Sequence, residues 1–91
     1  MALTKETVVD KIEVLEVGNV QVRTATRVLE DGVQLSQAYH RHVLEPSTKT
    51  DGSWADTDIS GEDARVQAIA TATWTAEVKT AYQEMIDVQT L

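Results

Sequence analysis

Two histidines in one short segment are the residues of this sequence best suited to chemistry. His40 and His42 flank Arg41, and residues two apart on a strand share a face, roughly 7 Å apart along the chain. Two imidazoles so placed could begin a zinc site, which needs a third or fourth ligand. Asp10 is expected two strands away, and Arg23 is expected opposite His40, where its positive charge opposes a metal ion. We therefore predict no metal at this pair.

The other polar groups do not form a recognisable site. Asp51, Asp56 and Asp58 make one segment acidic, but an EF-hand calcium loop needs ligands at fixed spacing and a glycine at its sixth position. Asp51 followed by Gly52 does not fit that pattern. The serines have no histidine and acid placed to activate a nucleophile. The sequence thus predicts a protein that is not an enzyme and that has no cofactor and no metal.

Composition narrows the class of partner. The 91 residues carry a net charge of -7, which argues against nucleic-acid binding, since that needs basic side chains to replace counterions. No apolar run approaches the roughly 18–20 residues of a membrane span, and Met1–Glu6 lacks the apolar stretch of a secretory signal peptide. We expect one domain, 1–91, made in the cytosol. A chain this short buries little surface, so oligomerisation is expected.

The chain reads as three strands, a loop and a helix. Strands are predicted at about 7–17, 20–29 and 33–44, where β-branched residues are frequent. Gly18-Asn19 is predicted as a type II′ turn and Asp31-Gly32 as a type I′ turn. Pro46 cannot donate to a ladder, so the third strand should end before it.

A polar loop is predicted at 45–60 and a helix at about 61–87. Ser60 is the expected N-cap of this helix, because its hydroxyl can accept from a first-turn amide. An apolar stripe at helical spacing marks the face that should be buried: Val66, Ala70, Trp74, Val78, Ala81, Tyr82 and Met85. The predicted fold is α+β, a three-stranded antiparallel β-meander with one long C-terminal α-helix packed on one face.

The two predicted turns also assign the faces of the sheet. The face under the helix should collect Val9, Leu15, Val17, Val20, Val22, Val28, Leu35, Tyr39 and Val43. The opposite face should carry a contiguous apolar patch, which a second copy or another protein would cover: Val8, Ile12, Val14, Ala25, Leu29, Ala38 and Leu44. Trp54 either folds back over the edge of the sheet and helix or is an exposed anchor for a partner. The predicted interface is therefore Val8, Ile12, Val14, Arg23, Ala25, Leu29, Ala38, His40, His42 and Trp54.

Several segments together resemble a family of short uncharacterised proteins of tailed bacteriophages, especially marine ones. The residues concerned span most of the chain: Met1-Ala2-Leu3-Thr4-Lys5-Glu6, Tyr39-His40-Arg41-His42-Val43-Leu44-Glu45-Pro46, Gly61-Glu62-Asp63-Ala64, Val66–Thr75, Val78 and Ala81-Tyr82. The resemblance implies a viral setting and assigns no chemistry to any residue.

Two functions are compatible with this reading. The first is a non-enzymatic phage protein, a small virion component or an assembly accessory, that acts through protein–protein contacts. The second is a small acidic phage effector that binds a host protein in the cytoplasm. The expected location is the virion or the host cytoplasm, and the expected partner is another copy of the chain or a viral protein.

Overall fold

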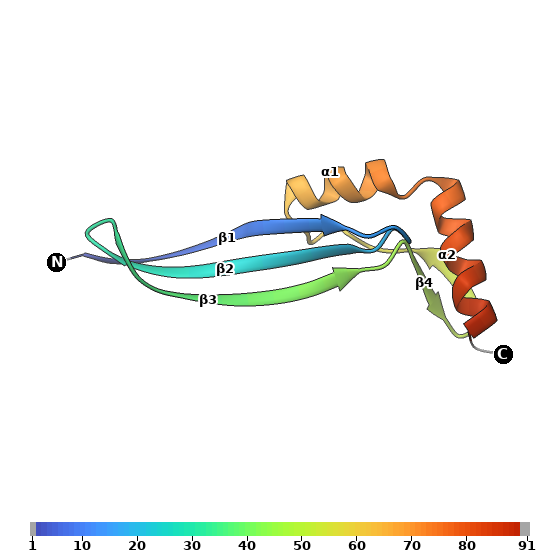
Figure 1. Cartoon of the computed structure of the whole chain (residues 1–91), viewed down its shortest axis with the longest axis horizontal. Coiled ribbons are helices and arrows are strands. Elements are labelled where there is room, and N and C mark those ends of the chain that lie inside the picture. Colours follow the sequence, from blue (N-terminus) through green and yellow to red (C-terminus); the bar gives the residue numbers. More distant parts are fainter. Residues whose placement is uncertain (1, 90–91) are drawn as a thin grey trace.

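The protein is an α+β structure with a long three-stranded sheet. The remaining strands and the helices lie at one end of this sheet (Figure 1). A computed structural model describes residues 2–89. Along the chain the elements are β1 (Leu3–Val14), β2 (Val20–Glu30), β3 (Val33–Leu44), β4 (Ser47–Thr50), β5 (Ser53–Asp56), α1 (Ala64–Thr73) and α2 (Ala76–Gln89). The first three strands form an antiparallel sheet in the order β1-β2-β3, as predicted, and a second small sheet and two helices stand where a loop and one long helix were predicted.

The turn between β2 and β3 is the one that the sequence predicted. Glu30 pairs with Val33, so Asp31-Gly32 is a two-residue turn. Both central residues have positive φ, 52° at Asp31 and 84° at Gly32, as a type I′ turn requires. The predicted type I′ turn is confirmed.

The connection between β1 and β2 is longer than predicted. The Gly18 amide donates to the Leu15 carbonyl, and the Leu15 amide donates to the Asn19 carbonyl, both at 2.9 Å. Gly18 has a φ of 97°. A turn followed by a left-handed residue is a common three-residue hairpin loop. The predicted two-residue turn at Gly18-Asn19 is therefore wrong, and β1 ends at Val14 rather than near residue 17.

Register shifts change which side chains face the helices. Val20 pairs with Val14 and Leu44, whereas the predicted turns paired it with Val17 and Val43. An irregularity near Asp10 limits the odd shift in β1 to its half nearest the helices, whereas the odd shift in β3 covers the strand from Ser36 to Leu44. A shift by an odd number of residues turns side chains to the other face. Five predicted core residues are exposed: Leu15, Val17, Leu35, Tyr39 and Val43.

The predicted polar loop contains a second hairpin. β4 and β5 pair through the turn Asp51-Gly52, whose φ values are 51° and 80°. This is the same Asp-Gly turn chemistry as at Asp31-Gly32. The hairpin packs beside α2, where the Trp54 and Tyr82 rings meet edge to face with centroids 6.1 Å apart.

The predicted single helix is two helices separated at Trp74-Thr75. The side chain of Asp63, not Ser60, caps α1 by accepting from the Arg65 amide at 2.8 Å. Thr75 is the N-cap of α2. Its hydroxyl accepts from the Val78 amide at 3.3 Å, a role that threonine favours. The Trp74 indole donates to the Gly18 carbonyl at 2.7 Å in a buried position. The break therefore lies where a side chain is fixed to the first hairpin loop.

The hydrophobic core lies between α1 and the nearest half of the sheet. Predicted core residues Val20, Val22, Val66, Ala70 and Trp74 are buried there together with Leu44, and Val9, Ile12, Ile59 and Val78 pack against this cluster. Ile12 and Leu44 belong to the face that the sequence had placed away from the helix. Their burial follows from the odd register shifts.

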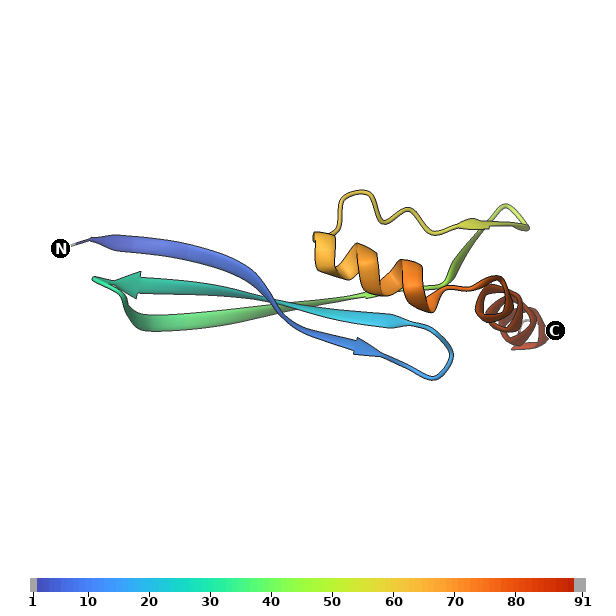
Figure 2. The same cartoon turned by 90° about the horizontal axis from the view of Figure 1, so that it is seen from above.

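The rest of the sheet extends away from this core. The molecule measures 58 × 25 × 23 Å and has a radius of gyration of 17.1 Å, against about 12 Å for a compact domain of this length. We call residues 2–8 and 25–39 the distal ribbon and the remainder of the described chain the base. Both helices and the second hairpin belong to the base (Figures 1 and 2). Within the distal ribbon the only buried residue is Ala25.

Candidate functional site

The histidine pair ties the sheet to the start of α1. The rings of His40 and His42 stack with centroids 6.3 Å apart, and His42 Nε2 lies 2.7 Å from Glu62 Oε1. Arg23 pairs with Arg41 and not with His40, so the predicted neighbour of the pair is wrong. Across residues 2–89 no group of three or more histidine, cysteine and acidic side chains is placed to hold a metal. His42 and Glu62 thus make a polar contact between β3 and the residues preceding α1.

The face of the sheet away from α1 carries a polar network that crosses all three strands. Arg23 makes a two-point contact with Asp10 at 2.8 and 2.9 Å, and its guanidinium carbon lies 4.3 Å from the Tyr39 ring centre. The hydrogen bond from Arg23 holds the pKa of Asp10 below its usual range. Further along, Arg27 contacts Gln37 at 2.7 Å and Glu6 at 3.1 Å. Because each arginine already has a carboxylate partner, this network joins the strands and does not form an anion site.

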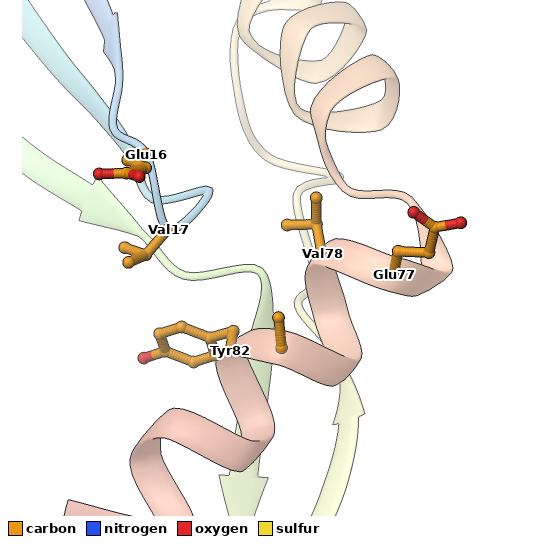
Figure 3. Close-up of a pocket in the computed structure, with 6 residues that line it drawn as sticks. Glu16, Val17, Glu77, Val78 and Tyr82 are labelled. Atoms are coloured by element: carbon orange, nitrogen blue, oxygen red, sulfur yellow. The ribbon is translucent and has the colours of Figure 1, made fainter.

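An apolar groove separates the first hairpin loop from α2 (Figure 3). It has a volume of about 320 Å³ and is lined by Glu16, Val17, Glu77, Val78, Ala81 and Tyr82. Val17 comes from the loop, and the helix supplies Val78 and Tyr82 at a spacing of one turn. The two glutamates lie on opposite sides of the apolar floor. Such a groove suits an apolar side chain that has a positive charge beside it.

Two details fix the shape of this groove. A Cβ atom on Gly18 would lie 2.6 Å from Val78 and 3.0 Å from Pro46, so only glycine allows the loop to approach α2 this closely. Burial, followed by the charge of Glu45, raises the pKa of the Tyr82 phenol. The groove is therefore a candidate binding surface.

The two edges of the sheet differ in charge. β1 carries five charged residues along its twelve: Lys5, Glu6, Asp10, Lys11 and Glu13. β3 has the same length and carries only Arg41. Every residue of β3 from Val33 to Arg41 is exposed. Charged residues on an edge strand discourage pairing with another chain, and β3 lacks this protection.

The structure divides the predicted interface residues between two faces and a separate hairpin. By strand alternation, the face away from α1 holds Val8, Arg23, Ala25 and Leu29. The register shifts turn others toward the face of α1: Ile12, Val14, Ala38, His40 and His42. Trp54 lies half-buried on β5 against Tyr82, so it folds back onto α2. The single contiguous apolar face that the sequence predicted is therefore not formed.

Comparison with known proteins places the chain in no group. No family model, no curated protein and no solved structure matches it. Among the described residues, none of the helices is both long and apolar enough to cross a membrane. The candidate site therefore consists of the distal ribbon, its edge strand β3 and the groove. Sequence reasoning missed the groove. The sequence shows only an apolar residue, Val17, next to the turn residue Gly18.

Proposed function

We propose that this chain is a non-enzymatic phage protein that acts through protein–protein contacts, as a small virion component or an assembly accessory. The distal ribbon carries the proposal. It projects beyond the base, and its interior contains only one small buried side chain, Ala25. A chain gains little from ordering such an extended element for its own core, because ordering costs backbone entropy and little apolar area is buried in return. An element of this kind is best explained by what it contacts in an assembly.

The polar groups of the chain also support a role in binding. The side chains best suited to catalysis or ion binding contact one another instead: His42 contacts Glu62, and Arg23 contacts Asp10. Exposed apolar side chains are instead frequent on the distal ribbon, as Leu3, Val33, Leu35 and Tyr39 illustrate. Exposed apolar residues of this kind contribute to contacts with other proteins.

Mass spectrometry of purified particles from the phage that encodes the chain tests this proposal. A stoichiometric amount of the chain in mature particles is expected for a virion component, and its presence in precursors alone is expected for an assembly accessory. Chemical cross-linking should join the ribbon lysine Lys5 to a viral protein or to another copy. Absence from particles and from precursors would overturn the proposal.

The groove favours a second candidate function, that of an acidic effector that binds a host protein. Glu16 and Glu77 flank its apolar floor and would attract a basic, apolar segment of a partner. Pull-down from host lysate with the wild-type chain and with a Glu16→Gln/Glu77→Gln variant tests this function. Capture of one host protein that is lost in the variant would favour it over the virion role.

A further inference from the structure

We propose that the edge of β3 pairs with β3 of a second copy, so that two sheets join into one continuous antiparallel sheet of six strands. This inference deepens the proposed function, because it names the surface and the occupant of one protein–protein contact. Within the described chain, the backbone of β3 pairs with β2 on one side only. On the other side alternate amides and carbonyls face outward, as they do on any sheet edge.

The side chains along this edge leave it open to pairing. The regular part of the strand begins at Ser36, beyond the irregularity at Leu35, and its exposed stretch continues through Arg41. It contains no acidic residue and no proline. A strand of twelve residues is about 41 Å long, so even part of this edge offers a long row of backbone hydrogen bonds.

Charge favours the edge of β3 over the edge of β1 as the place where two copies meet. The chain as a whole carries -7, so two copies repel each other wherever their acidic residues meet. Glu6, Asp10 and Glu13 all lie on β1, two strands away from the edge of β3. That is a separation of about 9.6 Å within each sheet. A contact from β3 to β3 therefore joins the two least acidic edges of the molecules.

Symmetry gives this contact a natural end point. Two antiparallel copies of one strand are related by a two-fold axis, and the assembly closes as a dimer. A pairing of β3 with β1 of the next copy would instead continue without closing. With the axis at Ala38, Arg41 of one copy lies opposite Leu35 of the other, so the two arginines are not neighbours. The same axis places Tyr39 opposite Gln37, two polar-tipped side chains that already meet within one copy.

Light scattering coupled to size exclusion tests the proposal on the full chain. The wild-type protein is expected to be a dimer that dissociates on dilution. A Ser36→Lys/Ala38→Lys variant should lose the dimer, because it adds like charges to the paired edge. The matched control, Thr4→Lys/Thr7→Lys, adds the same charges to exposed positions of β1 and should remain dimeric.

A cysteine variant provides a second readout that does not depend on added charge. The chain has no cysteine, so Ala38→Cys near the axis should form a disulfide-linked dimer under mild oxidation faster than Thr7→Cys does. A wild-type chain that is monomeric throughout, or a dimer that the β3 lysines leave intact and the β1 lysines abolish, would overturn self-pairing. A monomer that is nevertheless present in particles would overturn self-pairing alone and would leave the proposed function standing.

Discussion

The base and the distal ribbon are built from the same three strands, yet different forces hold them. In the base, Val20 and Val22 are buried under α1 beside Trp74, so apolar burial supplies the stabilisation. In the distal ribbon, the ladder is joined by exposed polar pairs such as Arg27 with Glu6, and exposed ion pairs contribute little. Two ends of one sheet can therefore differ widely in stability, and the less stable end is the one available for contacts.

The largest difference in the free energy of unfolding should come from removing one aromatic ring from the base and one from the distal ribbon. Trp74→Ala deletes a side chain that is 8% exposed, together with its hydrogen bond to Gly18. It should lower the free energy of unfolding by about 3–5 kcal/mol, as followed by circular dichroism in urea. Tyr39→Ala, at a residue that is 49% exposed, should cost about 1 kcal/mol or less.

If Trp74→Ala does not fold, Trp74→Phe keeps a ring and removes only the indole donor. That variant should cost about 1–3 kcal/mol, since the Gly18 carbonyl is left without its partner in a buried position. Equal losses for the Trp74 and Tyr39 variants would contradict the division into base and ribbon.

The glycines of the two turns in the three-stranded sheet offer a closer comparison. Gly18 and Gly32 both have positive φ, so alanine at either position introduces backbone strain of about 1 kcal/mol or more. Only at Gly18 would the new Cβ also meet Val78, at 2.6 Å, whereas Gly32 has open space around it. Gly18→Ala should therefore cost about 1–3 kcal/mol more than Gly32→Ala, from overpacking. Thermal unfolding of both variants measures this, and equal costs would show that the loop does not press on α2.

The smallest expected effect on stability is at the junction of the base and the distal ribbon, where Asp10 contacts Arg23. The folded chain lowers the pKa of Asp10, chiefly through the hydrogen bond from Arg23. Stability from this carboxylate is therefore present above its unfolded pKa of about 4 and is lost as the pH falls through the lower folded value. Urea unfolding at neutral and acidic pH should show a weaker pH dependence in Asp10→Asn than in the wild type. An unchanged dependence would mean that Asp10 does not link the strands in solution.

Local turn chemistry predicted part of the fold correctly. Asp-Gly between two alternating runs predicts a type I′ turn, and Asp31-Gly32 forms one. Asp51-Gly52 has the same chemistry, but short polar segments flank it, so the pattern of alternation that marks strands is missing there. Gly18-Asn19 fits both a two-residue turn and a three-residue loop ending at Gly18. Only packing against Val78 and Pro46 decides between these, and such contacts between distant segments are invisible in a local pattern.

The helix break and the groove were beyond sequence reasoning for related reasons. Trp74 and Val78 are four residues apart, so the apolar stripe continues across the break and gives no sign of it. What ends α1 is the contact from the Trp74 indole to Gly18, which joins residues 56 apart. The groove likewise needs Val17 and Tyr82 side by side. A sequence predicts its elements far better than the meeting of a loop and a helix from opposite halves of the chain.

The placement of β1 has a mechanical consequence. Ala2 lies at the tip of the ribbon, next to Asp31, whose side chain accepts from its amide at 3.1 Å, while Gln89 lies at the opposite end of the molecule (Figure 1). A pull applied between these two residues would run along β1 from the tip to the base, loading its ladder with β2 in shear. β3, which continues through β4 toward α2, pairs only with β2 in this sheet, so the load would reach its ladder only after the ladder of β1 with β2. An assembly held together through β3 could thus be stretched by its chain ends without the load passing first through the contact between copies.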